Sequence, residues 1–129
     1  MNYLLDTHLL VWSALNSGKL SAVARKLIAD RNNTLYCSAA SLWEVAIKNA
    51  LRRPDFPVEA GSLRAGLIAN GYRELAIEGR HVMAYRDLPT VHRDPFDRLL
   101  VAQAKAEGLE LLTADRQLKQ YGHPVCFVG

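Results

Sequence analysis

The chain has 129 residues, of which 50% are hydrophobic and 22% are charged. This length allows one domain with a single core and is too short for two domains of ordinary size, and the composition excludes a disordered chain. The formal net charge is only +3, so electrostatic attraction alone does not identify a nucleic-acid partner. Arginine outnumbers lysine, eleven to five, which suits phosphate contacts but is equally explained by ordinary surface charge.

Neither a membrane span nor a secretion signal is expected. The apolar runs, for example residues 3–5, are far shorter than the ~18 to 20 residues that cross a bilayer. Asp6 and His8 interrupt any apolar segment of a signal peptide. Cys37 and Cys126 have no metal-binding or redox spacing, which predicts free thiols in buried strands. We therefore expect a cytoplasmic protein with a single domain over residues 1–129.

The first half of the chain alternates short apolar strands with helices. Residues 2–6 are typical of a buried strand, and residues 7–15 of a helix. Ser21 is a good N-cap for a second helix that reaches about residue 30. β-branched and aromatic residues predict a strand over 34–37, and Ser38 then caps a helix over 39–51. The two prolines of residues 52–58 predict a loop.

The second half repeats this alternation. Residues 59–70 predict a helix that ends at Gly71, and a short strand over 72–77 and a helix over 78–86 follow. Residues 94–107 form the clearest helix, with Asp94 at the N-cap and Pro95 at the first helical position. The remaining expected elements are a strand over 109–113, a short helix over 115–120 and a strand over 125–128.

This order predicts an α/β fold, a three-layer α/β/α sandwich around a parallel sheet of four or five strands. Asp6 and Asp115 lie at or just past the ends of predicted strands, and Glu44 and Asp97 lie in the first turns of helices. Open α/β sheets bind ligands beyond the carboxyl ends of their strands, so these four acids can face one volume. Two carboxylates about 4 Å apart repel by roughly 4 kcal/mol at an effective dielectric of about 20. A hard divalent cation is the usual remedy, and no His or Cys set suggests zinc.

Helix capping explains the same acids one at a time. Asp94 and Asp97 fit the N-cap and third positions of their helix, and Asp6 and Asp115 also precede helices. Glu44 is placed to form an exposed salt bridge with the lysine four residues later. The pattern is therefore compatible with a metal site and with a set of caps and surface charges.

Four blocks of sequence carry a resemblance to a known family. Residues 4–12 read LLDTHLLVW, 38–48 read SAASLWEVAIK, 92–104 read HRDPFDRLLVAQA and 112–115 read LTAD. Together these blocks resemble the PIN-domain ribonucleases, and specifically the VapC-like toxins of type II toxin-antitoxin systems. The resemblance covers nearly the whole chain, and the combination of DPFDRLLVAQA with an N-terminal LLDTH is highly specific.

The resemblance implies a PIN-like fold and an endoribonuclease that hydrolyses RNA with Mg²⁺ or Mn²⁺. It implies that Asp94 is a cap within reach of the ion and that Thr113 and Thr7 hold the site by hydrogen bonds. It further implies a small antitoxin as protein partner and a homodimer. The alternative is a PIN-fold protein that processes or binds RNA without being a toxin. The catalytic, metal-binding acids that it implies are Asp6, Glu44, Asp97 and Asp115.

Other side chains near these acids have ordinary explanations. His8 and His92 are expected to be hydrogen-bonded residues rather than ligands, and Trp12 and Trp43 to be core or interface anchors. Several arginines near the predicted site or on the 52–58 loop are candidate contacts to an RNA backbone, although solvated surface charge is the alternative. These arginines are Arg52, Arg53, Arg93, Arg98 and Arg116.

Three other classes of protein share part of this pattern. A phosphoacceptor receiver domain needs paired acids after its first strand and a lysine after its last, but Thr7 and His8 follow Asp6 and residues 126–128 hold no lysine. A haloacid-dehalogenase-type phosphatase needs a second aspartate at position 8, where histidine stands. The third class is a non-catalytic binding module whose acids only cap helices. Stabilisation of the chain by Mn²⁺ would distinguish a metal-binding nuclease from such a module.

Overall fold

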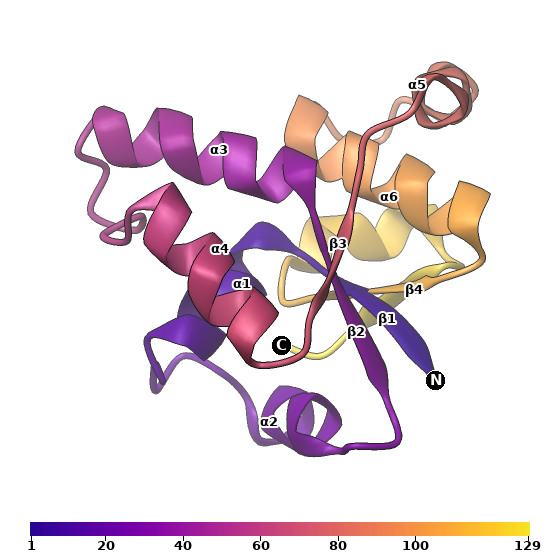
Figure 1. Ribbon diagram of the computed structural model, residues 1–129. Coiled ribbons are helices and arrows are strands. Elements are labelled where there is room, and N and C mark those ends of the chain that lie inside the picture. The colour runs from indigo at the N-terminus through magenta and orange to yellow at the C-terminus, as the bar shows by residue number, and fades with distance from the viewer.

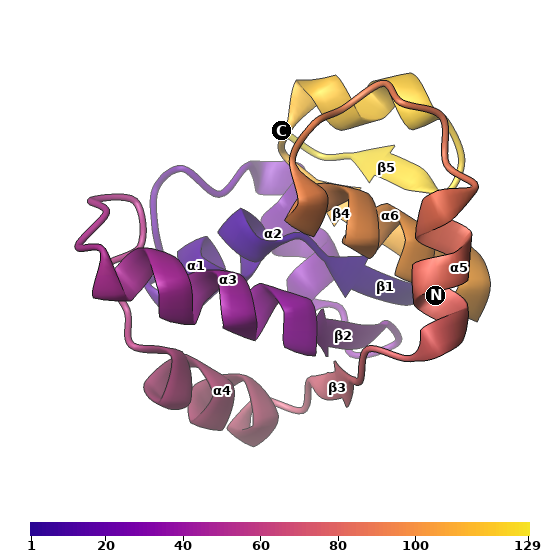
Figure 2. The same ribbon diagram turned by 90° about the horizontal axis from the view of Figure 1, so that it is seen from above.

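The computed structural model describes residues 1–129 and shows a five-stranded sheet between two layers of helices (Figures 1 and 2). This arrangement confirms the predicted α/β fold class. The strands are β1 (Asn2–Leu5), β2 (Thr34–Ser38), β3 (Arg73–Leu75), β4 (Glu110–Thr113) and β5 (Val125–Phe127). The helices are α1 (Thr7–Ala14), α2 (Ala22–Ala29), α3 (Ala39–Ala50), α4 (Ala60–Ala69), α5 (Gly79–Arg86), α6 (Pro95–Glu107) and the 3₁₀ helix η1 (Arg116–Tyr121).

All neighbouring strands are parallel, in the order β3-β2-β1-β4-β5. The chain runs outward from β1 to β2 and β3, then returns through α5 and α6 to β4 on the other side of β1. The direction of progress therefore reverses between β1 and β4, which is the point where open α/β sheets bind ligands. The N–H of Asp6 donates to the carbonyl of Leu112 at 2.9 Å, which ties the end of β1 to β4.

The two faces of the sheet bury different side chains because successive residues of a strand alternate between them. Leu5 belongs to a core cluster with Leu10 of α1 and Leu63 of α4. Leu4 belongs to the opposite cluster, with Leu100 of α6 and Leu118 of η1. In Figure 1 the helices α1, α2 and α4 lie to the left of the strands, and α5 and α6 lie to the right.

Local sequence signals set the ends of the helices, as predicted. The side chains of Asp6, Ser21, Ser38 and Asp94 each accept a hydrogen bond from a backbone N–H in the first turn of the following helix. Helix α6 ends at Gly108, whose φ of 69° is left-handed and favours glycine. These caps place the start of every site-bearing helix at the same edge of the sheet.

The observed elements differ from the predicted ones mainly at the edges of the sheet. Strand β3 covers only Arg73–Leu75 rather than residues 72–77, because it has a single neighbour and pairs with β2 at three positions. Both cysteines are free, with Cys37 buried and Cys126 half-buried on the edge strand β5. None of the helices is both long and apolar enough to cross a membrane.

Candidate metal centre

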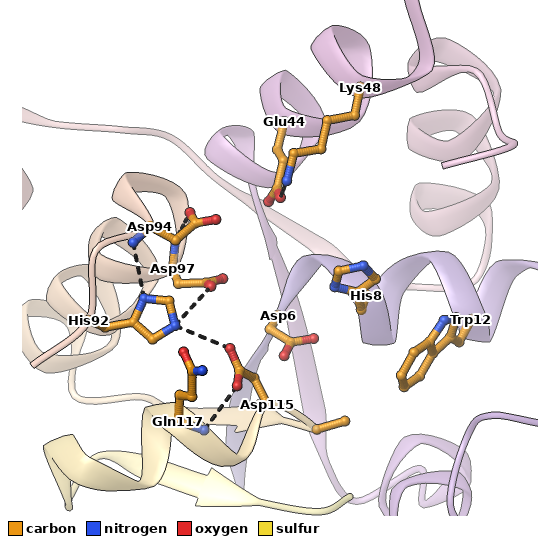
Figure 3. A pocket seen from close by; sticks show the side chains of 11 residues that line it. Asp6, His8, Trp12, Glu44, Lys48, His92, Asp94, Asp97, Asp115 and Gln117 are labelled. Atoms are coloured by element: carbon orange, nitrogen blue, oxygen red, sulfur yellow. Dashed lines mark hydrogen bonds and ion pairs between the residues drawn. The ribbon is translucent and has the colours of Figure 1, made fainter. Parts of the chain in front are cut away.

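A cavity of about 450 Å³ opens at the carboxyl ends of β1 and β4 (Figure 3). The four acids that the sequence pattern predicts for the site all line it: Asp6 after β1, Glu44 on α3, Asp97 on α6 and Asp115 after β4. Segments that are far apart in the sequence therefore bring their carboxylates to one place. The other lining residues are His8, Trp12, Lys48, His92, Asp94, Ala114 and Gln117.

Asp6 lies at the bottom of the site and is only 4% exposed. Its carboxylate accepts hydrogen bonds from the N–H of Leu9, at 2.9 Å, and from the hydroxyl of Thr113. The Thr113 oxygen also accepts the N–H of Asp115 at 2.9 Å, which confirms the prediction that this threonine holds the site by hydrogen bonds. Burial raises the pKa of Asp6 above its ordinary value, although these hydrogen bonds oppose the shift.

Glu44 is 3% exposed, and its side chain is paired with a lysine. Its Oε2 accepts a hydrogen bond from Lys48 Nζ at 2.5 Å, whereas its Oε1 has no hydrogen-bond partner. The predicted salt bridge is therefore present, but the prediction that it is exposed was wrong, because only 18% of the Lys48 side chain is accessible. A buried carboxylate oxygen without a donor is costly, and it is available to a ligand in the cavity.

The pKa of Asp97 is also raised by its surroundings. Burial, followed by repulsion from the carboxylates of Asp94, Asp6, Glu44 and Asp115, raises its pKa to about 8. Asp94 is the N-cap of α6, as predicted, because one of its oxygens accepts the N–H groups of the second and third helical residues at 2.8 and 3.1 Å. Asp94 nevertheless lines the cavity as well, so it adds to the negative charge there.

His92 also lines the cavity, and its ring is hydrogen-bonded, as predicted. Its Nδ1 accepts the N–H of Asp94 at 3.0 Å, so the neutral ring carries its proton on Nε2. That nitrogen lies 3.3 Å from Asp115 Oδ2 and 3.7 Å from Asp97 Oδ2 (Figure 3). The available sequence signal was its position two residues before the Asp94 cap. His8, on the opposite wall, pairs with Asp55 at 3.3 Å.

Several residues near the predicted site point elsewhere. Arg98 is buried and structural, because it donates to the carbonyl of Pro89 at 3.0 Å and stacks on the ring of Tyr85 at 4.7 Å. Thr7 donates to the hydroxyl of Ser41 at 3.0 Å and so joins α1 to α3 rather than holding an acid. Trp43 is 57% exposed and is not a core residue. None of the arginines Arg52, Arg53, Arg93, Arg98 and Arg116 lines the cavity.

The donor set fits a hard divalent cation. Carboxylate oxygens are the ligands that Mg²⁺ and Mn²⁺ prefer, and no thiol lines the cavity. One possible ligand atom each from His92, Asp97 and Asp115 lies within 4.8 Å of the others. The raised pKa of Asp97 reflects the crowding of carboxylates around the cavity, and the Oε1 atom of Glu44 has no donor from the protein.

Comparison with known proteins agrees with this fold. Residues 3–124 match the family described as PIN domain. The chain therefore belongs to the PIN-domain family, as the four sequence blocks indicated. It is similar to ribonuclease VapC22 of Mycobacterium tuberculosis, with 30% identity over 122 residues that cover 94% of this chain and 92% of that protein.

Solved structures share the same architecture. A toxin-antitoxin complex from Klebsiella pneumoniae contains a chain with a TM-score of 0.62 and 20% identity, covering 96% of this chain and 95% of that one. VapC20 from Mycobacterium tuberculosis, described as a sarcin-ricin loop cleaving toxin, has a TM-score of 0.62 and 19% identity, covering 93% of this chain and 95% of that one. At these identities the likeness concerns the fold, and it confirms a PIN-like α/β/α sandwich.

Proposed function

We propose that this protein is an endoribonuclease that hydrolyses RNA phosphodiester bonds with Mg²⁺ or Mn²⁺ and acts as the toxin of a toxin-antitoxin pair. The observation that carries the proposal is the convergence of Asp6, Glu44, Asp97 and Asp115 on one cavity at the reversal of strand order. Membership of the PIN-domain family and similarity to a ribonuclease support the reaction class.

These four acids would hold the cation. When bound, a divalent cation polarises the phosphodiester and acidifies the attacking water. Asp6 and Asp115 are oriented for this task by the hydroxyl of Thr113, which contacts both residues. His92 presents its Nε2 proton between Asp97 and Asp115, where it opposes their mutual repulsion. Hydrolysis of this kind needs no nucleophilic side chain.

The N-terminus of α6 adds a favourable field for an anionic substrate. The first residues of this helix border the cavity, and Asp94 and Asp97 lie in its N-cap and first turn. The positive end of the helix dipole therefore faces the same space as the carboxylates. It lowers the cost of holding several acids together and favours the approach of a phosphate group.

The proposed partners are a small antitoxin and a second copy of the chain. A second cavity, of about 400 Å³, lies between α1, α2 and α4 and is lined mainly by apolar side chains, among them Ile28, Leu63 and Leu67. This cavity suits an apolar peptide segment. Structural likeness to a chain of a toxin-antitoxin complex supports the antitoxin as a partner.

The homodimer contact is proposed for a different surface. Exposed Trp43 and Val82 line an apolar depression that suits such a contact.

Cleavage of RNA tests the proposal directly. The substrates are a pool of structured and single-stranded RNA and a sarcin-ricin loop oligonucleotide, each with Mg²⁺, Mn²⁺ or chelator. We expect wild type to cleave RNA only when Mg²⁺ or Mn²⁺ is present. The control Asp87→Asn, which changes an exposed acid paired with Arg86, should behave in the same way. Asp6→Asn should not cut. Equal cutting by wild type and Asp6→Asn, or in chelator, would refute the assignment of the metal site.

The role as a toxin is tested in cells. Induced expression of wild type should arrest growth, and co-expression of the neighbouring small reading frame should restore it. Asp6→Asn should leave growth unchanged. RNA cleavage without growth arrest would instead identify a PIN nuclease that processes RNA.

A further inference from the structure

Lys48 is the only lysine or arginine that lines the acidic cavity. It lies one helical turn after Glu44 on α3, so its side chain reaches the same wall of the site (Figure 3). The cavity contains five carboxylates, from Asp6, Glu44, Asp94, Asp97 and Asp115. The proposed substrate is a polyanion that must enter this negative space. A cation already present at its wall is therefore the natural contact for a phosphate group.

The Lys48 ammonium group is held in place rather than free in solvent. It lies 4.9 Å from the centre of the Phe56 ring and 5.9 Å from that of Phe96, within the range of cation-π attraction. Phe56 is 1% exposed and follows α3 in the chain, whereas Phe96 is the residue before Asp97 on α6. Two separate segments thus confine the lysine at the edge of the metal-binding acids.

The partner of Lys48 in this structure is an acid that the proposed cation would also bind. Lys48 Nζ lies 2.5 Å from Glu44 Oε2, while Glu44 Oε1 has no partner. A divalent cation at Glu44 would compensate its charge and would leave the lysine free to pair with another anion. Lysine is a compact charge on a flexible stem, so it can turn from one oxygen to another without movement of the backbone.

We propose that Lys48 binds a phosphate oxygen of the RNA, exchanging its ion pair with Glu44 for one with the substrate when the cation is bound. This inference rests on the proposed nuclease function and adds a residue to its substrate site. Contact between Lys48 and RNA is thereby coupled to the metal: without the cation the lysine stays with Glu44, and with the cation it turns to the phosphate.

The test compares wild type with Lys48→Met and Lys48→Arg, and with Lys105→Met as a control on the exposed last turn of α6. Binding of a short fluorescein-labelled single-stranded RNA is measured by anisotropy at several salt concentrations, in Mg²⁺ and in chelator, and a gel verifies that the probe stays intact. Binding of Mn²⁺ alone is measured by thermal shift. These two readouts do not depend on cleavage.

In Mg²⁺ we expect Lys48→Met to bind RNA about tenfold more weakly than wild type, as for one lost charge-assisted contact. Its salt slope should fall by roughly 0.7. In chelator the two proteins should bind alike. Lys48→Arg should keep most of the affinity, and Lys105→Met should match wild type. Mn²⁺ should bind Lys48→Met at least as tightly as wild type, because a competing cation has been removed.

Three results would overturn the inference. If Lys48→Met weakens Mn²⁺ binding as much as RNA binding, the lysine only orients Glu44. If Lys48→Met and wild type bind RNA equally in Mg²⁺, the lysine does not contact the substrate. If wild type itself shows neither a Mn²⁺ shift nor metal-dependent RNA binding, the proposed function fails together with the inference.

Discussion

Two clusters in this molecule each combine one histidine with two carboxylates, but the pKa of a carboxyl group is raised in one cluster and lowered in the other. In the cavity, His92 meets Asp97 and Asp115, and where α5 packs on α6, His81 meets Glu78 and Glu107. In each cluster one possible ligand atom per residue lies within 4.8 Å of the others. Residue type and proximity therefore do not distinguish a metal site from a structural ion pair.

The cluster between α5 and α6 is compensated by an arginine. His81 is completely buried, its Nδ1 accepts the N–H of Glu78 at 3.0 Å, and its Nε2 lies 2.7 Å from Glu107 Oε2. Arg80 pairs with both carboxylates. The hydrogen bond from His81 holds the pKa of Glu107 below its ordinary value. These contacts fasten α5 to α6 and give each carboxylate an arginine partner.

The cavity differs because its acids outnumber its cations. Burial and four neighbouring carboxylates raise the pKa of Asp97 to about 8, the reverse of the shift at Glu107. One oxygen of Glu44 remains without a donor. Uncompensated buried charge, rather than the mere presence of ligand-type residues, is the property that supports a cation site here.

The largest expected effect is on catalysis. Asp97→Asn should lower the rate of RNA cleavage on the order of 1,000-fold, equivalent to about 4 kcal/mol, because it removes a proposed metal ligand. Glu107→Gln, the matched change in the compensated cluster, should stay within about twofold of wild type. Initial rates in Mg²⁺ measure both. A similar loss in both variants would show that the two clusters do not differ in function.

The free energy of unfolding should depend more on the cluster between α5 and α6 than on the cavity. His81→Ala removes a fully buried ring and the hydrogen bonds that join α5 to α6, so the free energy of unfolding should fall by about 3 kcal/mol. His8→Ala, at a side chain that is 41% exposed, should cost less than about 1 kcal/mol. Urea unfolding in chelator measures both values. Equal costs would contradict the structural role of the compensated cluster.

Mn²⁺ should distinguish the clusters without any substrate. At a concentration 100-fold above its dissociation constant, Mn²⁺ should stabilise wild type by about 2.7 kcal/mol. Glu107→Gln should show the same shift, and Glu44→Gln less than half of it, since only the second change touches the cavity. Thermal unfolding with and without Mn²⁺ provides the measurement. An undiminished shift in Glu44→Gln would remove Glu44 from the proposed ligands.

The smallest expected effect is on the pH dependence of the metal-free protein. The pKa of Asp97 is about 8 in the folded chain against an ordinary value of 3.8, so the folded state holds a proton that the unfolded state releases. The contribution of this group to the free energy of unfolding is complete below about pH 4 and should decline as the pH rises towards 8. Unfolding in chelator at pH 5 and pH 8 tests this, and Asp97→Asn should flatten the decline.

The contribution of Glu107 to stability should depend on pH in the opposite direction. Its folded pKa lies below the ordinary value of 4.5, so its contribution is present above that pH and is lost as the pH falls through the folded pKa. Glu107→Gln should therefore weaken the acid dependence and leave the slope between pH 5 and pH 8 unchanged. A changed slope in that range would mean that the two clusters are coupled.

The sequence by itself determined the elements and where the acids stand relative to them. Asp6, Ser38 and Asp94 cap the helices that they were predicted to cap, and α6 ends at Glu107, as predicted. Capping and turn formation depend on residues a few positions apart, so a single sequence can reveal them. The alternation of strands and helices then predicted the parallel sheet, and with it the end of the sheet where the four acids meet.

Only the tertiary structure decided which charges are balanced. Lys48 was predicted to pair with Glu44, but the rings of Phe56 and Phe96 that confine it come from segments that its local sequence does not specify. His81 and His92 likewise look alike in the sequence, although Arg80 pairs with the acids around His81, whereas no arginine lines the cavity that contains His92. Burial and Coulomb interactions depend on distances through space, and packing between distant segments sets those distances.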